Sequence, residues 1–170
     1  MSLNFGEFNS VVKIFEQQSS IHKDKPYLWR KIEDQYKPLS WQEVRKQVEG
    51  LSSALKNIGT LEGDRVIIVS ENRPEWQIAD LSIMTIGAIS VPAYTTSTTS
   101  DYEYIIKHSG ARCIIISSHE LAKKVLPAVA NSPQCQTVIK INEDNENYDL
   151  PVSIHSWNSL IKENNSSLLN

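Results

Sequence analysis

The chain has 170 residues, of which 17 are lysine or arginine and 20 are aspartate or glutamate, giving a formal net charge of −3 at pH 7. A chain of this length fits one domain, 1–170, that can bury about 70% of its unfolded surface. No segment joins clustered basic residues to interleaved aromatic ones, so nucleic acid is not an expected partner.

The N-terminal part is expected to form a helix followed by a β-hairpin. The apolar face of the first helix repeats at steps of three and four residues: Phe8, Val11, Val12 and Phe15. Tyr27–Ile32 alternates enough to be a strand, and Tyr36–Leu39 can return it across Glu33–Gln35. No Asn-Gly or Asp-Gly pair fixes the register of that turn.

The second predicted helix has the clearest start and stop signals. Ser40 and Glu43 have the spacing of a capping box, in which the hydroxyl and the carboxylate satisfy each other's backbone N–H groups. Gly59 suits the left-handed residue that ends a helix. Apolar residues recur between these two points: Trp41, Val44, Val48, Leu51, Leu55 and Ile58.

Strands and helices then alternate from Arg65 to Ile141 with short connections. The predicted strands are Val66–Ser70, Ala88–Tyr94, Ala111–Ser117 and Gln136–Ile141. The predicted helices between them are Pro74–Ile86, Asp101–Ser109 and His119–Val129. This order indicates an α/β fold with a mostly parallel sheet, helices on both faces and right-handed crossovers.

Smaller features refine these helices. Ser100 and Glu103 predict a second capping box, and Gly110 is expected to close the same helix. Pro127 is expected to kink or shorten its helix, because proline lacks the N–H that a helix interior uses. Trp76 is expected to pack between helix and sheet in preference to stacking on a ligand.

The character of the chain changes after Ile141, so the core is expected to cover about 8–141. Asn142–Asp149 is rich in asparagine and acidic residues and predicts a surface loop. Ile154–Ile161 predicts a short helix around Trp157 and Leu160. The polar tail Lys162–Asn170 is expected to fray.

The compartment is expected to be the cytoplasm. Met1–Phe15 lacks the basic start and apolar run of a secretory signal. The stretch Ile78–Tyr94 is broken by polar residues, glycine and proline, whereas a membrane helix needs about 20 apolar residues. Cys113 and Cys135 are the two cysteines, which fits a reducing compartment, and Cys113 is expected to fill the core.

Few residues suggest chemistry. The hydroxyl run Thr95–Ser100 could bind an anion, but a polar connection ending in the N-cap Ser100 is favoured. Asp64 and Arg65 are expected to form a surface ion pair in preference to a substrate site. Gly59–Gly63 has the wrong order for a dinucleotide site, since a helix precedes it and a strand follows. The histidines have no zinc-site spacing: His22, His108, His119 and His155.

Five short segments occur in an order and with a spacing that can be compared with known families. They are G-D-R-V at Gly63–Val66, E-N-R-P-E-W at Glu71–Trp76, I-A-D-L at Ile78–Leu81, G-A-x-x-V-P at Gly87–Pro92 and H-S-G-A-R at His108–Arg112. In order and spacing the chain resembles the N-terminal region of the AMP-forming acyl-CoA synthetases, in the adenylate-forming ligase superfamily, over residues 8–161. The sequence E-N-R-P-E-W at Glu71–Trp76 is most similar to the corresponding segment of the long-chain fatty-acid branch. One departure is Thr95-Thr96, where many members have a proline after the residue that matches Tyr94.

The resemblance implies a whole enzyme that uses ATP and Mg²⁺ to convert a fatty acid into an acyl-adenylate and then transfers the acyl group to CoA. The family's phosphate loop and catalytic lysine match nothing between Met1 and Asn170, so no catalytic, cofactor-binding or metal-binding residue is assigned here. Fatty acid, ATP and CoA would bind through a downstream region, and this chain alone is expected to be inactive. It would form a partial N-terminal subdomain of the ligase fold.

Two alternatives stay open. The first is a stand-alone α/β module that binds a small ligand in a crevice between Ser70–Asn72, Tyr94–Thr99 and Ser117–Ser118. The second is a degenerate relative that serves only as an interaction partner. As an isolated piece the chain is expected to expose apolar surface and to self-associate. How the whole enzyme would approach a membrane, including peripheral association, is left open.

Overall fold

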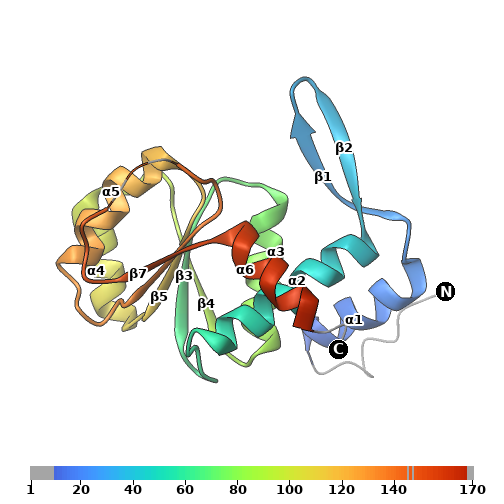
Figure 1. Cartoon of the computed structure of the whole chain (residues 1–170), viewed down its shortest axis with the longest axis horizontal. Coiled ribbons are helices and arrows are strands. Elements are labelled where there is room, and N and C mark those ends of the chain that lie inside the picture. Colours follow the sequence, from blue (N-terminus) through green and yellow to red (C-terminus); the bar gives the residue numbers. More distant parts are fainter. Residues whose placement is uncertain (1–9, 145, 147, 168–170) are drawn as a thin grey trace.

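The computed structural model describes residues 10–144, 146 and 148–167, which form a parallel sheet between two layers of helices, with a hairpin beside them (Figure 1). The helices are α1 (Val11–His22), α2 (Trp41–Asn57), α3 (Pro74–Thr85), α4 (Thr99–Ser109), α5 (His119–Ala130) and α6 (Trp157–Ser167). The strands are β1 (Pro26–Ile32), β2 (Gln35–Ser40), β3 (Arg65–Val69), β4 (Ile89–Ala93), β5 (Cys113–Ile116), β6 (Thr137–Lys140) and β7 (Ser153–Ser156).

The sheet has the strand order β4-β3-β5-β6-β7, and all its pairs are parallel. This confirms the predicted α/β class. The predicted hairpin is also confirmed, because β1 and β2 pair antiparallel with Ile32 opposite Gln35. Each central strand is buried on both sides, as a parallel sheet covered by helices requires.

Alternation along the strands produces two apolar layers. One side packs against α2, α3 and α6 and contains Val66, Ile68, Cys113, Ile115 and Ile139. The other side packs against α4 and α5 and contains Ile67, Val69, Ile114, Ile116 and Val138. Figure 1 shows the two helical layers on opposite sides of the strands. Trp76 packs against the first layer, as predicted.

The prediction for the C-terminal part was wrong in two respects. Ser153–Ser156 forms a strand and not the start of a helix, because β6 offers it a free edge of backbone hydrogen-bonding groups. The helix begins at Trp157 and continues through 162–167, which were expected to fray. Ile161 and Asn164 explain this, since both are buried and Asn57 Nδ2 donates to Asn164 Oδ1 at 2.6 Å. The last predicted tail residues, 168–170, lie outside the described residues.

The predicted cap of α4 was also wrong. The capping box consists of Thr98 and Asp101 in place of Ser100 and Glu103: Asp101 N donates to Thr98 Oγ1 at 3.3 Å, and Thr98 N donates to Asp101 Oδ2 at 2.8 Å. Both pairs have the same spacing, and the extended backbone at Thr98 selects the earlier one. Glu103 instead pairs with Lys107 on the exposed face of α4. Gly110 closes the helix with a φ of 66°, as predicted.

Two further expectations about helices need correction. In α1 the buried residues are Phe15 and Ser19, whereas Val11 is 57% exposed, and among the described elements α1 packs chiefly against α2. Phe8 lies outside the described residues. Pro127 does not shorten α5, which continues to Ala130 with Leu126 and Ala128 held in the core, so that part of the expectation was wrong and the kink stays a prediction.

Across the described part of the chain, the helices lack the combined length and apolar character that crossing a bilayer requires.

Candidate functional site

The carboxyl ends of the parallel strands meet at one edge of the sheet. The neighbours β3 and β5 lead into α3 and α5, which lie on opposite faces. Open α/β sheets bind ligands in the crevice at such a switch point. The structure brings Glu71 against Ser117 and Ser118, so two of the three segments named for the alternative small-ligand crevice lie next to each other. Tyr94–Thr99 follows β4, on the other side of β3.

The side chain of Glu71 occupies the switch point. The Ser117 hydroxyl donates a hydrogen bond to Glu71 Oε2, and the Ser118 hydroxyl donates to Oε1 at 3.4 Å. Partial burial favours the neutral acid, but the hydrogen bonds from Ser117 and Ser118 outweigh it and lower the pKa of Glu71. The group is therefore a carboxylate at neutral pH, and it disfavours an anionic ligand at this point of the edge.

Ser117 is expected to control the ionisation of Glu71. Because the folded-state pKa lies below the unfolded value of about 4.3, the stabilisation is complete above that value and is lost as the pH falls through the folded pKa. Ser117→Ala should raise the pKa of Glu71, measured by carboxyl carbon NMR during acid titration. Ser118→Ala is the matched control and should raise it less, since its hydrogen bond is long. Equal pKa values in the parent chain and in Ser117→Ala would contradict this account.

A second polar cluster joins the hairpin to this edge. Glu75 is 5% exposed and accepts from Arg30 Nη2 at 2.5 Å and from Arg73 Nε at 2.8 Å. Arg73 Nη1 also donates to Asn142 Oδ1 at 3.0 Å, just beyond β6. The hairpin and the start of α3 therefore meet at one buried carboxylate that faces two guanidinium groups, and Arg73 links this pair to the residue after β6.

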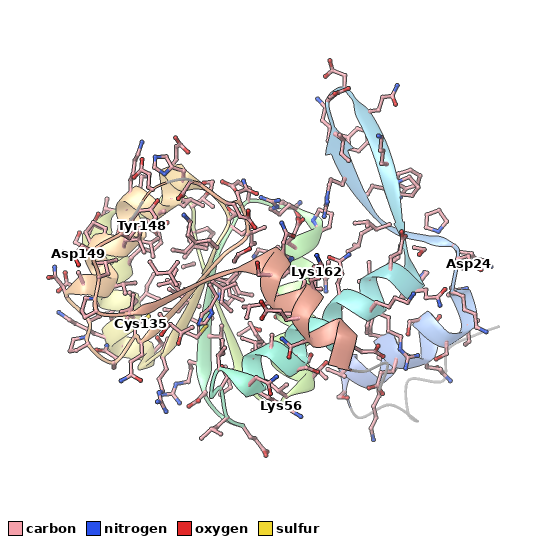
Figure 2. The ribbon with its side chains drawn as sticks, viewed as in Figure 1. Asp24, Lys56, Cys135, Tyr148, Asp149 and Lys162 are labelled. Atoms are coloured by element: carbon pink, nitrogen blue, oxygen red, sulfur yellow. The ribbon has the colours of Figure 1, made fainter. Side chains whose placement is uncertain are left out.

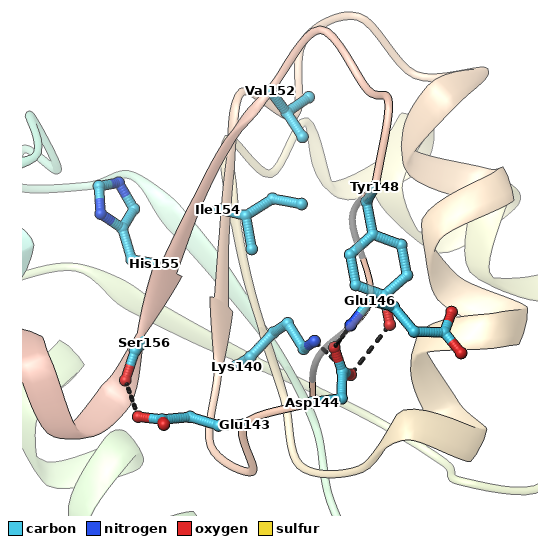
Figure 3. A pocket seen from close by; sticks show the side chains of 9 residues that line it. All are labelled: Lys140, Glu143, Asp144, Glu146, Tyr148, Val152, Ile154, His155 and Ser156. Atoms are coloured by element: carbon cyan, nitrogen blue, oxygen red, sulfur yellow. Dashed lines mark hydrogen bonds and ion pairs between the residues drawn. The ribbon is translucent and has the colours of Figure 1, made fainter.

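A cavity of about 410 Å³ opens at the carboxyl ends of β6 and β7 (Figure 3). Lys140 lies within it, 7% exposed, and forms an ion pair with Asp144. The Tyr148 hydroxyl donates to Asp144 Oδ2 at 2.9 Å, and Lys140 Nζ lies 4.5 Å from the centre of the Tyr148 ring. Figure 3 shows Ile154 pointing toward Tyr148, whereas His155 lies on the opposite side of β7.

The positive charge of Lys140 in this cavity is offset by the negative charge of Asp144. Burial raises the pKa of Asp144, but hydrogen bonds from Lys140 and Tyr148 prevail and lower it. Burial and the nearby Asp144 charge raise the pKa of Tyr148 to about 12. The lysine charge is thus already neutralised by Asp144. Sequence reasoning missed this group, because Asn142–Asp149 was interpreted only as a surface loop.

Other candidate residues have structural roles. Asp64 and Arg65 do not pair with each other, so that prediction was wrong. Arg65 Nε donates to the Ser109 carbonyl at 2.7 Å, while Asp64 Oδ2 accepts from Leu61 N at 2.9 Å. The carbonyls at the end of α4 attract the guanidinium more than an exposed carboxylate does. Gly59 and Gly63 have φ values of 91° and 79° in the turn between α2 and β3.

The histidines lie apart and have different neighbours. His119 Nδ1 lies 3.3 Å from the Tyr148 hydroxyl, and its Nε2 lies 3.4 Å from Glu146 Oε1. His22 packs against Trp41 with the two rings tilted by 40°, and His108 stacks on Tyr104. Among residues 10–144, 146 and 148–167, no three histidine, cysteine, aspartate or glutamate side chains are grouped to hold a metal ion.

Both cysteines are free and buried, which confirms that Cys113 fills the core. Burial raises the pKa of both thiols, that of Cys135 to about 11. Cys135 precedes β6 (Figure 2). Neither thiol is a nucleophile at neutral pH, because the reactive species is the thiolate.

The sequence and the fold of this chain are both similar to those of known proteins. The family model described as AMP-binding enzyme matches residues 15–165. The long-chain-fatty-acid–CoA ligase FadD15 of Mycobacterium tuberculosis is 26% identical over 136 residues, which cover 80% of this chain and 23% of the relative. The long-chain-fatty-acid–CoA ligase 6 of Mus musculus is 32% identical over 128 residues, covering 74% of this chain and 18% of the relative.

The chain therefore spans about a fifth of the length of these curated relatives. Among solved structures, the anthranilate CoA ligase AuaEII in complex with anthranoyl-AMP matches with a TM-score of 0.81 at 22% identity. That match covers 95% of this chain and 30% of the other. At this identity the likeness establishes a shared fold.

Proposed function

This chain belongs to the AMP-binding enzyme family, and we propose that it forms the N-terminal part of an ATP-dependent fatty-acid–CoA ligase. The whole enzyme would transfer the AMP part of ATP to the fatty-acid carboxylate, releasing pyrophosphate, and then transfer the acyl group from the acyl-adenylate to CoA, releasing AMP. The observation that carries the proposal is the continuous family match from residue 15 to residue 165. Long-chain ligases among the relatives support a fatty acid as the carboxylate.

The chemistry of the carboxyl edge supports the idea that this chain provides structure while other parts of such an enzyme bind the substrates. A triphosphate needs hydrogen-bond donors and positive charge. At the switch point this chain offers the Glu71 carboxylate, whose hydroxyl neighbours already donate to it. We propose that ATP and CoA are held by residues outside this chain, and that the sheet supplies a rigid wall beside them.

Magnesium is implied for the whole reaction, where it would offset the charge on the phosphates. The described residues do not fit a magnesium site, because their carboxylates are not grouped as oxygen ligands. We therefore assign the ion to no residue of this chain and derive no step through it. We also propose a cytoplasmic location, supported by the two unpaired cysteines.

Pyrophosphate exchange tests the proposed function. The 170-residue chain, with ATP, Mg²⁺ and a long-chain fatty acid, is expected to give no exchange above background. The protein translated from the whole native reading frame is expected to give exchange that depends on the fatty acid and to form acyl-CoA when CoA is added. A reading frame without a ligase segment downstream, or exchange by the purified 170-residue chain, would overturn the proposal.

A stand-alone binding module is the competing function, and the 410 Å³ cavity at Lys140 is the observation in its favour. Calorimetry of the 170-residue chain with ATP, AMP and a fatty acid separates the two functions. Saturable, tight binding by this chain alone would favour the module, whereas the ligase proposal expects no measurable heat.

A further inference from the structure

The hairpin β1–β2 projects away from the sheet and its helices (Figures 1 and 2). Its register places Trp29 opposite Pro38 and Lys31 opposite Tyr36. Because paired residues share a side of the ribbon and alternate along it, these four side chains form one face, which we call the outer face. Trp29 is 54% exposed and Tyr36 is 68% exposed, so two aromatic rings stand in water on a narrow ribbon.

The opposite face of the hairpin is anchored. Leu28 and Leu39, which are paired, pack against the core. On the same face Arg30 donates to the buried Glu75 on α3 at 2.5 Å. These contacts fix the direction in which the ribbon projects. The outer face is therefore presented in a set orientation, and a partner that covers it loses little freedom of the ribbon on binding.

Exposure of the outer face is unfavourable for the ribbon itself. A two-stranded hairpin without cover is only marginally stable in water, and a third strand or a helix normally supports it. Tryptophan and tyrosine are also the residues that most often anchor protein contacts. Within the described part of the chain, the core covers only the face that carries Leu28, Arg30 and Leu39, so we expect a contact on the outer face.

The size of the outer face indicates what kind of partner can cover it. A ribbon about 23 Å long and about 10 Å wide offers only about 230 Å². A stable contact between separate proteins buries about 800 Å² on each side. A contact within one polypeptide needs far less, because the covalent link supplies a high effective concentration. The area therefore favours a partner on the same polypeptide over a second copy of this chain.

We propose that the outer face of the hairpin, Trp29, Lys31, Tyr36 and Pro38, is a docking surface for the part of the ligase that lies outside these 170 residues. This inference rests on the proposed function. The curated relatives are about five times longer than the part that this chain matches, so they have ample chain to supply the cover. The expected partner surface is apolar and accepts flat rings, since Lys31 already forms an ion pair with Asp34 at 3.4 Å.

Hydroxyl-radical labelling read by mass spectrometry tests the docking surface. Labelling of Trp29 and Tyr36 is compared between the 170-residue chain at low micromolar concentration and the full-length protein, each normalised to its unfolded state. The expected result is strong labelling in the short chain and labelling about fivefold lower in the full-length protein, as when a half-exposed ring becomes buried. Equal labelling in the two proteins would overturn the inference.

Other partners for the outer face would give different labelling patterns, and each of these patterns would also overturn the inference. Protection that appears in the 170-residue chain as its concentration rises within the low micromolar range would identify a second copy as the partner. Protection that appears only with phospholipid vesicles would identify a membrane. A full-length protein with ligase activity and unprotected rings would defeat the docking surface alone, whereas a protein without ligase activity would defeat the proposed function.

A variant pair supports the labelling. Trp29→Ser with Tyr36→Ser should lower the melting temperature of the full-length protein more than that of the 170-residue chain, because the rings would be buried only in the former. An equal shift in both proteins would show that the rings stabilise the hairpin alone, and this too would overturn the inference.

Discussion

Glu75→Gln is expected to lower the free energy of unfolding by about 2 kcal/mol, because it leaves Arg30 and Arg73 without their anionic partner. Removing one member of a fully buried pair costs about 3–5 kcal/mol, but both arginine side chains retain some contact with water. Their exposed fractions are 38% and 26%, against 7% for the Glu75 side chain. Urea denaturation of the 170-residue chain measures the change.

The matched control for Glu75→Gln is Glu49→Gln. Glu49 accepts from Arg45 Nε at 2.8 Å, a distance like those at Glu75, but both side chains of that pair are about half exposed. Solvent screens such a pair, so the control should change stability by less than about 0.5 kcal/mol. A double-mutant cycle with Arg30→Met should then show coupling between hairpin and α3. Similar effects of the two glutamine substitutions would mean that burial gives Glu75 no special role.

The Glu75 cluster also shows why part of the structure could not be predicted from sequence. The strands and helices from Arg65 to Lys140 follow from local alternation, capping residues and glycine positions, and they were predicted. The contact between Arg30 and Glu75 joins residues that are 45 positions apart, and no local pattern specifies it. In the same way, β7 depends on the free edge of β6, which exists only once the sheet has formed.

The switch point and the Lys140 cavity show the same contrast at the candidate site. The meeting of Ser70–Asn72 with Ser117–Ser118 could be predicted, since the ends of parallel strands share an edge. That Glu71 would take the hydrogen bonds of both serines could not be, because this depends on a side-chain direction. Lys140 ends a buried apolar strand, and that position could have signalled a paired lysine.

The resemblance to adenylate-forming enzymes was predictable for a different reason. The segments Gly63–Val66 and Glu71–Trp76 keep their order and spacing, and the family match over 15–165 confirms the membership. In physical terms these segments build the entry to β3 and the start of α3, with Glu71 and Glu75 as polar anchors. They stabilise the scaffold, so they identify the family without naming a substrate.

The largest loss of stability is expected from Tyr102→Ala, at about 4 kcal/mol. The Tyr102 ring is 1% exposed within the apolar layer of α4 and α5, and its hydroxyl donates to the Tyr94 carbonyl at 2.7 Å. Truncation would leave a cavity between α4 and the sheet and would remove one of the two hydrogen bonds that the Tyr94 carbonyl accepts, the other coming from Ser97 N at 3.2 Å. Thermal and urea unfolding of the 170-residue chain measure the effect.

Two further variants distinguish the contribution of the Tyr102 ring to stability from that of its hydroxyl and from the effect of any tyrosine substitution on α4. Tyr102→Phe keeps the ring and should cost about 1 kcal/mol, the contribution of one hydrogen bond. Tyr104→Ala lies on the same helix with a side chain that is 65% exposed, so it should change stability by less than about 0.5 kcal/mol. If Tyr102→Ala and Tyr104→Ala proved equally mild, α4 would not be packed on the sheet as described. The connection 94–98, which Tyr102 ties to α4, would then be free to move at the edge where we place the wall of the ligase site.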